Sequence, residues 1–358
     1  MAAGPLRAVV TGGSKGIGLH LALEIARRPE AQVVFGGRSP LESLPSATRA
    51  LIDGLPPGRA RYYPVDVTSN DSLSLFREAV AGFLRVTSSS RFVVIANAGQ
   101  AALDKDTDRV AAMRRTNIDG TSTFFSMFQW LLGIDGGTFI PLSSIEATRG
   151  IVIPGRRGHF DTKVFTRDYA RRTHAALMDS DYPITAWALA PGVVRTDMTE
   201  EGPLFCSLGL AVAKRAPTDP ALRAGLETYF CVSADNFNNV TFVLGAMFGE
   251  TSEGRALSSA RRLLAGDPSA SKNKTRLMVF RALSEGAVLA RVAGLLVALD
   301  IAMAPEVFAR RVVDFIESGE YPPNGVLEVF SAHEGDPSKA PILSYLSAFA
   351  AAAPEGSG

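Results

Sequence analysis

Apolar and polar positions follow two alternating periods along the first two hundred residues of the chain. Short runs of apolar and β-branched residues, typical of buried strands, alternate with segments whose apolar residues recur at helical spacing. The predicted strands are Arg7–Val10, Gln32–Phe35, Arg61–Pro64, Phe92–Ala96, Thr138–Leu142 and Ile184–Ala188. Because strands that alternate with helices pair in parallel and are covered on both faces, the pattern predicts a three-layer, doubly wound α/β fold.

The pattern changes after Thr199. Residues 201–304 contain helix-like stretches and no clear strand. A helix that starts at Pro305, a turn and a strand at Val326–Phe330 follow, and we expect this unit to complete the sheet. The organisation predicted from the pattern is an α/β domain of residues 1–200 and 305–345, a mostly helical insertion or lid at 201–304, and a flexible tail at 346–358.

Composition supports an ordinary globular protein. Of the 358 residues, 46% are hydrophobic and 20% charged, which excludes a disordered, collagen-like or coiled-coil chain. The formal charge of +1 gives no overall attraction to nucleic acid or to anionic membranes. The two cysteines, Cys206 and Cys231, make no disulfide framework, and with four histidines they argue against a zinc site.

No membrane-spanning or leader segment is expected. The first apolar run leads directly into a glycine motif, whereas a signal peptide needs a longer apolar stretch. The longest apolar candidate, Ala287–Ala304, is interrupted by Arg291 and Asp300 and is interpreted as a buried helix. These features lead us to expect a cytoplasmic protein.

A glycine-rich loop follows the first strand and opens a helix. Gly12 permits a tight turn, Gly16 lets a diphosphate approach the backbone, and Gly18 lets helix and strand pack closely. The free N–H groups at the helix start would face the phosphates, which predicts a Rossmann-type dinucleotide-binding domain. The residues expected to bind the cofactor here are Thr11, Gly12, Ser14, Lys15, Gly16, Ile17 and Gly18.

The end of the second strand indicates which dinucleotide is bound. An NAD site usually has an acidic residue there that holds the ribose 2′-hydroxyl, but this chain has Arg38. A guanidinium pairs well with a 2′-phosphate, and Lys15 would add a second positive charge. Arg38 therefore favours NADP(H), while a solvated loop arginine is the alternative.

Together these motifs resemble the short-chain dehydrogenase/reductase family over about residues 6–200 and 305–335. The spacing of Thr11–Gly18 is the variant of the glycine fingerprint that this family uses, and further family motifs follow in order. The resemblance implies cofactor contacts from Asp66, Val67, Asn97, Ala98, Gly99, Lys163, Pro191, Gly192, Val194 and Thr196. It also implies that Asn117 and Ser144 are members of the catalytic set, Ser144 binding the substrate oxygen and Asn117 positioning Lys163 through water.

The chain departs from this family at the catalytic tyrosine. The family pattern is Tyr-x-x-x-Lys, whereas here His159 precedes Lys163 by four residues, and the gap of 15 residues from Ser144 is slightly longer than the family's. Arg156 and Arg157 would account for the extra pair. An imidazole has a free pKa near ~6.5 against ~10 for a phenol, and a nearby lysine cation lowers it further. We therefore expect a neutral ring, which can still polarise a carbonyl through its N–H.

Two functions from different classes follow from these residues. In the first, the chain is an NADP(H)-dependent oxidoreductase that interconverts a small-molecule carbonyl and an alcohol, with Lys163 on the nicotinamide ribose and His159 as a non-standard proton donor. In the second, it is a catalytically silent, nucleotide-binding scaffold or a subunit of a larger assembly, in which His159 only fills the pocket. The resemblance leaves a homo-oligomer open and does not identify the substrate.

Two basic clusters remain unassigned at this level. Arg149, Arg156 and Arg157 lie between Ser144 and His159, where they would either bind a substrate anion or form a solvated rim. A second run, Arg255–Arg281, would face an acidic partner, a nucleotide, a membrane surface or solvent.

Overall fold

A computed structural model of the chain describes residues 4–85, 87, 89–133, 136–152, 156–178, 184–196 and 303–329. The predicted insertion or lid at 201–304 lies outside the described residues, apart from Met303 and Ala304, and so do the predicted tail and the basic run Arg255–Arg281. The chain divides into two compact units, one of which contains Met1–Gly192 and Pro305–Val329. The predicted domain boundaries at 200 and 345 stay a prediction.

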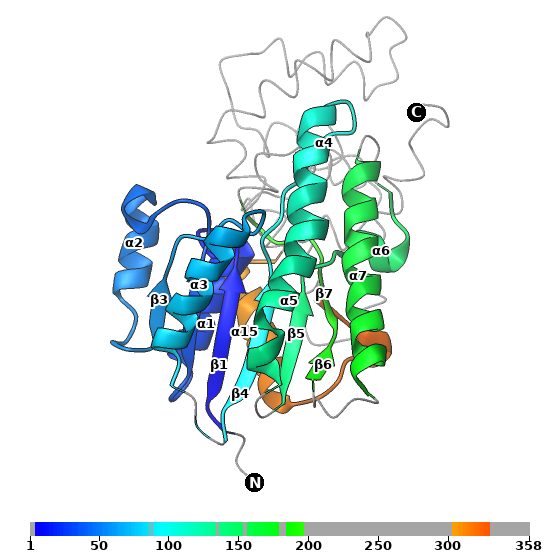
Figure 1. The fold of residues 1–358 in the computed structure, drawn as a ribbon. Helices are drawn as coiled ribbons and strands as arrows, with labels where there is room; N and C mark the ends of the chain where they lie inside the picture. The colour runs from blue at the N-terminus through cyan, green and yellow to red at the C-terminus, as the bar shows by residue number, and fades with distance from the viewer. Residues whose placement is uncertain are drawn as a thin grey trace, which may run out of the picture. The chain divides into compact units, whose positions relative to one another are not determined.

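The first unit is built on a parallel sheet, as the sequence predicts. Six strands pair in the order β3-β2-β1-β4-β5-β6, and all of these pairs are parallel (Figure 1). Strand order reverses between β1 and β4, which is where open α/β sheets bind ligands. The strands are β1 (Leu6–Thr11), β2 (Gln32–Gly36), β3 (Ala60–Tyr62), β4 (Arg91–Ala96), β5 (Gly137–Pro141) and β6 (Ile184–Ala186).

The predicted strand Ile184–Ala188 is divided in two in the structure. After β6, Trp187 interrupts the pairing and a separate strand, β7 (Ala188–Pro191), pairs in parallel with β8 (Val326–Val329). Trp187 N still donates to the Phe139 carbonyl (3.1 Å), but the next residue of β5 that would donate is Pro141, which has no N–H. The terminal helix–turn–strand unit therefore joins a two-stranded sheet, which an isolated bridge between Leu142 and Leu189 connects to β5.

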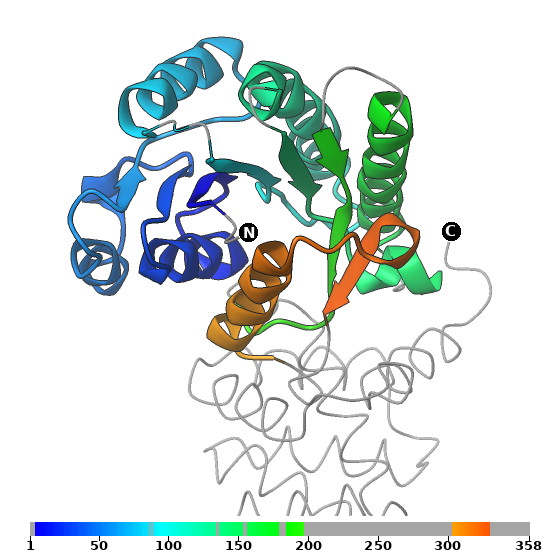
Figure 2. The same ribbon diagram turned by 90° about the horizontal axis from the view of Figure 1, so that it is seen from below.

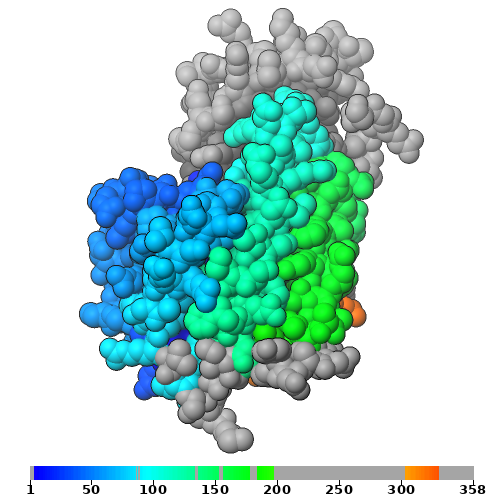
Figure 3. All heavy atoms as spheres, viewed as in Figure 1, coloured from blue at the N-terminus to red at the C-terminus, as the bar shows by residue number. Residues whose placement is uncertain are grey.

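Helices cover both faces of the sheet (Figure 2). On one face lie α3, α5 and α7, whose surfaces adjoin one another in the space-filling view (Figure 3), and on the other face α1 packs against α15. The helices are α1 (Gly16–Arg27), α2 (Ser46–Asp53), α3 (Asn70–Phe83), α4 (Thr107–Arg114), α5 (Thr121–Leu132), α6 (Ile145–Arg149), α7 (Arg157–Met178) and α15 (Pro305–Ser318), with a π-helical turn η2 (Arg115–Gly120) between α4 and α5 and short 3-10 turns η1 (Leu41–Ser43) and η4 (Pro323–Gly325). No helix among the described residues is long and apolar enough to span a membrane.

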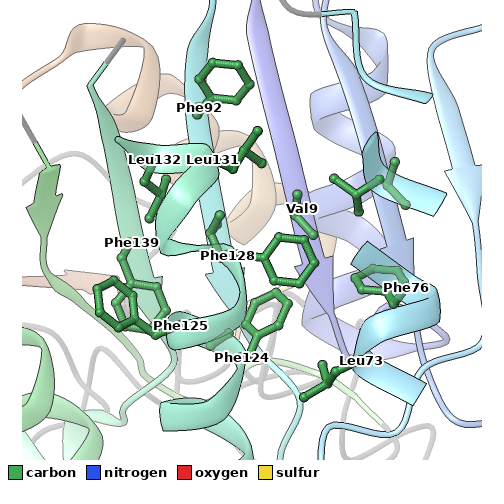
Figure 4. Packing of buried hydrophobic residues seen from close by; sticks show 14 of the residues in the cluster. Val9, Leu73, Phe76, Phe92, Phe124, Phe125, Phe128, Leu131, Leu132 and Phe139 are labelled. Carbon is green, nitrogen blue, oxygen red and sulfur yellow. The ribbon is translucent and has the colours of Figure 1, made fainter. Parts of the chain in front are cut away.

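Aromatic side chains fill the space between the sheet and the α3–α5 face (Figure 4). Phe124 and Phe128, one turn apart on α5, have ring centroids 4.8 Å apart, and Phe128 meets Phe76 of α3 edge-on at 5.9 Å. All three side chains are fully buried. Burying a phenylalanine stabilises a fold by ~1.5–3 kcal/mol, so this cluster fixes α5 and the π-helical turn before it against the sheet.

Candidate active site

The glycine loop at the end of β1 is held by the chain that follows β4. Asn97 Nδ2 donates to the carbonyls of Thr11 (3.0 Å) and Gly12 (3.1 Å), and Ala98 N donates to Thr11 Oγ1 (3.2 Å). The segment Asn97–Ala98 thus forms hydrogen bonds with two carbonyls and one hydroxyl of the glycine loop. Thr11, Asn97 and Ala98, all predicted as cofactor contacts from the sequence, form the base of this loop.

Close packing explains the glycines at two positions of the loop. Gly12 has a φ of +66°, and a Cβ there would lie 2.7 Å from Asn97 Nδ2. A Cβ on Gly18 would lie 2.3 Å from the same amide and 2.4 Å from the Gly12 carbonyl oxygen. Both sites exclude a side chain, so the start of α1 stays pressed against β1 and β4.

The start of α1 is suited to a phosphate. Its N-cap residue, Lys15, forms no side-chain cap hydrogen bond, because an ammonium group has no acceptor. The first backbone N–H groups of a helix need an acceptor and carry the positive end of the helix dipole. The loop therefore fits a cofactor diphosphate.

The end of β2 lies beside this loop. A Cβ on Gly37 would lie 2.7 Å from Ser14 Oγ, so the residue after it, Arg38, emerges next to the glycine loop. Arg38 is exposed, which leaves the residue accessible to a phosphate group of a cofactor. The structure thus brings Arg38 and Ser14 to one edge of the sheet.

The predicted adenine-side residues lie after β3. Asp66 Oδ1 accepts hydrogen bonds from Thr68 N (2.9 Å) and Thr68 Oγ1 (2.7 Å), which fixes the turn before α3. Val67 is buried against the π-helical turn, where a Cβ on Gly120 would lie 2.6 Å from its Cγ2. Val67 therefore also positions the segment that carries Asn117.

Asn117 lies in the π-helical turn, a geometry that is rare and frequent at functional sites. Its side chain is buried, and its Oδ1 accepts from Gln100 N (2.8 Å). Its Nδ2 donates to the Gln100 carbonyl and to Thr162 Oγ1, both at 3.0 Å. A Cβ on Gly99 would lie 3.4 Å from Asn117 Oδ1 and 3.7 Å from Lys163 Nζ, so the two predicted residues meet around Gly99.

The two serines after β5 have different partners. Ser143 Oγ is buried and donates to the Lys163 carbonyl (2.7 Å), which ties the serine segment to α7. Ser144 is the N-cap of α6, and its Oγ accepts from Glu146 N (3.2 Å). An N-cap serine keeps its own O–H proton, so Ser144 is still able to donate to another oxygen.

His159 and Lys163 lie one turn apart on α7, and both are buried. Lys163 Nζ donates to the Leu142 carbonyl (2.9 Å), and burial lowers the pKa of its ammonium to about 8. The neighbouring carboxylate of Glu146 opposes this shift, and Arg156 adds to it. Lys163 is therefore mostly charged near pH 7.

Burial, followed by the charges of Arg156 and Lys163, holds the pKa of the His159 imidazole well below its usual 6.5. A hydrogen bond with the Gln100 backbone opposes the shift, which means that the ring donates to that carbonyl. Nδ1 is buried and has no hydrogen-bond partner, so Nε2 carries the proton and Nδ1 a lone pair. The direction of this shift favours the neutral ring expected from the sequence, with its N–H directed to the Gln100 carbonyl.

Sequence reasoning missed three contributors to this site: Gln100, Thr162 and Glu146. Gln100 directly follows the Asn97–Gly99 turn, and Thr162 precedes Lys163, but their roles depend on backbone positions that a motif does not encode. Glu146, two residues after Ser144, is buried and forms an ion pair with Arg156 at 3.9 Å. A carboxylate so close to the predicted serine was the available signal.

The arginine cluster predicted near the substrate opening is divided among three acidic partners. Arg156 pairs with Glu146, while Arg157 pairs with Asp161 (2.9 Å) on the exposed side of α7. Arg149 pairs with Glu328 of β8. Of these three ion pairs, the one between Arg156 and Glu146 involves a buried carboxylate of the site.

The remaining predicted cofactor residues follow β7. Pro191 ends that strand, and Gly192 N donates to the Val329 carbonyl of β8 (2.9 Å). Val194 and Thr196 belong to the second compact unit, within which Val194 forms a bridge to Met303.

The chain matches a known protein family. The family model for short chain dehydrogenases matches residues 7–203, more than half of the chain. The chain therefore belongs to the short-chain dehydrogenase family, whose members are oxidoreductases acting on small molecules. This result supports the family assignment and the Rossmann-type fold predicted from the sequence.

Individual relatives are more distant. The hydroxynaphthalene reductase-like proteins Arp2 of Metarhizium brunneum and Metarhizium robertsii are each 29% identical over 202 residues, which cover 53% of this chain and 69% of theirs. An alcohol dehydrogenase of Thermococcus sibiricus complexed with 5-hydroxy-NADP is 26% identical, with a TM-score of 0.45 over 56% of this chain and 84% of that one. A Caenorhabditis elegans short-chain dehydrogenase/reductase solved with cofactor is 20% identical, with a TM-score of 0.49 over 62% of this chain and 83% of that one.

Proposed function

We propose that the protein is an NADP(H)-dependent oxidoreductase that interconverts a carbonyl and an alcohol, with His159 in the position that tyrosine holds in its family. The observation that carries the proposal is the buried His159–Lys163 pair on one face of α7, next to Asn117 and the Ser143–Ser144 segment. The relatives that are hydroxynaphthalene reductase-like agree with a carbonyl or hydroxyl substrate.

The charges at the glycine loop support the cofactor assignment. The uncapped start of α1 suits a diphosphate, and Arg38 with Lys15 suits a 2′-phosphate at the end of β2. NADP(H), when bound, would supply the hydride for reduction or take it in oxidation. The other named cofactor residues, from Asp66 to Thr196 along the chain, stay proposed contacts.

In the proposed mechanism the substrate oxygen accepts a hydrogen bond from Ser144 Oγ. During alcohol oxidation, His159 Nδ1 accepts the proton of the substrate hydroxyl, and in the reverse direction the imidazolium returns this proton to the substrate oxygen. Because the pKa of His159 lies well below 6.5, the imidazolium is a small fraction of the protein near pH 7, so in this mechanism reduction should become faster as the pH falls. The Lys163 ammonium would stabilise negative charge on the oxygen and hold the cofactor ribose.

A second function is favoured by two contacts. Lys163 Nζ donates to the Leu142 carbonyl, and His159 donates its N–H to Gln100, so both groups already have a partner within the protein. A site of this kind also suits a scaffold that binds the nucleotide and performs no hydride transfer. In that case NADPH binding would persist without turnover.

Three versions of the protein separate these functions: the wild type, His159→Ala and His159→Tyr. Each is titrated with NADPH and assayed with a panel of small activated ketones. General acid catalysis contributes about 10²–10⁴-fold, so an active histidine predicts that His159→Ala loses that factor and still binds NADPH. His174→Ala is the matched control, since His174 lies on the same helix about 22 Å away.

The tyrosine variant decides the remaining cases. Activity in His159→Tyr alone would mean that the wild type has lost catalysis and kept the framework. Absence of turnover in all three proteins, with NADPH bound to each, would refute the oxidoreductase and leave the scaffold.

A further inference from the structure

A buried ion pair adjoins the His159–Lys163 site, and neither the family motifs nor the proposed mechanism uses it. It consists of Glu146 on α6 and Arg156, the residue before α7. Their side chains are 9% and 13% exposed, and Arg156 Nη1 lies 3.9 Å from Glu146 Oε1. At this distance the interaction is mainly coulombic.

The carboxylate of Glu146 is only partly satisfied. Its Oε2 is buried without a hydrogen-bond partner, and burial raises the pKa of the carboxyl group, while Arg156 and Lys163 lower it. A buried carboxylate is costly unless cations compensate it. Two cations, Arg156 and Lys163, act on this one carboxyl group.

The groups that face Lys163 make Glu146 its main counter-charge. From β5, the turn after β4 and η2 it meets uncharged groups, namely the Leu142 carbonyl, Gly99 and Asn117. On its own helix segment it meets Arg156 and the neutral ring of His159. Among the described residues, the one acid that acts on the Lys163 ammonium is Glu146.

We propose that Glu146 and Arg156 are positioning residues that act on the charge of Lys163 in opposite senses: Glu146 favours its ammonium form, and Arg156 disfavours it. Neither residue is proposed to touch the substrate. The proposal rests on the proposed function only for what Lys163 and His159 do; the charge states themselves are measurable without turnover.

The arrangement has a chemical consequence. Neighbouring groups whose environments push their proton affinities apart take different roles in acid–base chemistry. Arg156 and Lys163 both disfavour the imidazolium of His159, whereas Glu146 acts on Lys163 and Arg156. Near pH 7 the site thus holds one mostly charged ammonium group and one imidazole that burial keeps from protonating, a single helical turn apart.

The test is a direct titration of Lys163. The protein is labelled with ¹³Cε-lysine, the Lys163 signal is assigned by its loss in Lys163→Arg, and its pKa is measured in the wild type, Glu146→Gln and Arg156→Gln. An opposite charge nearby shifts a pKa by ~1–3 and a like charge shifts it the other way. We expect Glu146→Gln to lower the proton affinity of Lys163 about tenfold or more, and Arg156→Gln to raise it.

Matched controls come from the exposed ion pair of Arg157 and Asp161 on the same helix, which is 65% and 42% exposed. Arg157→Gln and Asp161→Asn make the same charge changes in solvent, where screening is strong, and should leave the Lys163 titration unchanged. Glu146→Asp retains the negative charge and should restore most of the wild-type value.

Shifts of the Lys163 pKa in opposite directions in Glu146→Gln and Arg156→Gln are the result that a merely structural role would not produce. Shifts of the same sign, or no shift, would overturn the proposal. Should Arg156→Gln fail to fold, the double variant Glu146→Gln/Arg156→Gln removes both buried charges together and should place the Lys163 pKa above that of Glu146→Gln; a value equal to or below it would overturn the proposal as well. Because the titration needs neither cofactor nor turnover, an inactive protein would count against the proposed function alone.

Discussion

Different kinds of chemical group hold the glycine-loop region and the α6–α7 region in place. Around the loop, backbone groups and small residues determine the structure. Asn97 donates hydrogen bonds to two backbone carbonyls of the loop, and the packing around Gly12 and Gly18 leaves no room for a side chain at either position. Around α6 and α7, buried ionisable side chains make it, with Glu146 and Lys163 as opposite charges.

This difference determines what a motif can reveal. Backbone geometry depends on residue spacing, so a glycine pattern specifies the loop almost completely. Charge states depend on burial and on neighbours from other elements, so the pattern His-x-x-x-Lys specifies the position of the groups but not their protonation. The predictions below challenge this contrast, beginning with the largest expected effect.

Replacing the buried lysine should change how stability depends on pH. Burial lowers the pKa of Lys163 from 10.5 to about 8, so between these values the unfolded chain holds a proton that the folded protein lacks. The free energy of unfolding of the wild type relative to Lys163→Met should therefore rise by about 3 kcal/mol as pH increases through this range. Below pH 8 the buried ammonium group should destabilise the wild type by this full amount. Denaturant unfolding of both proteins from pH 7 to 10.5 measures this.

Lys105→Met, which removes an exposed lysine, controls for the loss of one positive charge. A stability difference between wild type and Lys163→Met that stayed constant with pH would show that the lysine is not desolvated, and the contrast between the two regions would weaken.

Most of the fold could be predicted from the sequence. Parallel strands and covering helices follow from strand–helix alternation, and six strands lie within one or two residues of their expected ranges. The division of the last strand could not be read from its own residues, since it depends on Pro141 in the neighbouring strand. Strand patterns describe one chain segment, whereas a ladder depends on two.

The site was predicted less completely. The family resemblance indicates Asn117, Ser144, His159 and Lys163, because the family motifs are local, and the catalytic roles of these residues stay a prediction. It missed the contact between Lys163 and the Leu142 carbonyl. Such contacts depend on side-chain direction within the folded protein, and one sequence carries no signal for them.

In the glycine-loop region, steric change should dominate. Gly18→Ala adds a Cβ 2.4 Å from the Gly12 carbonyl oxygen, which the backbone must avoid. Overpacking of this kind costs ~1–3 kcal/mol. If this amount is subtracted from the free energy of NADPH binding, the affinity for NADPH falls ~5- to 150-fold. Calorimetric titration with NADPH measures the loss.

Gly82→Ala is the paired control, because a Cβ at this glycine of α3 meets nothing within 4 Å. It should raise stability by ~0.5–1 kcal/mol and leave NADPH binding unchanged. Equal effects of the two alanines on NADPH affinity would contradict the steric explanation.

Arg38 is a charge-dependent feature of the loop region. A charge-assisted hydrogen bond contributes ~1.5–3 kcal/mol, so the wild type should prefer NADPH over NADH at least ~tenfold, and Arg38→Asp should abolish that preference. Arg49→Asp, on the exposed surface of α2, makes the same charge change as a control. Equal affinity of the wild type for both cofactors would refute the role of Arg38.

The smallest expected effect compares two N-cap serines, Ser144 in the α6–α7 region and Ser69 outside it. Ser69 Oγ accepts from Ser72 N (3.3 Å) at the start of α3, and Ser144 Oγ accepts from Glu146 N (3.2 Å) at the start of α6. Loss of an N-cap costs ~0.5–2 kcal/mol, so Ser69→Ala and Ser144→Ala should lower the free energy of unfolding by similar amounts in urea. If Ser144 also donates to the substrate oxygen, Ser144→Ala alone should lower kcat. An equal loss of kcat in both variants would mean that Ser144 acts on activity only through the stability of α6.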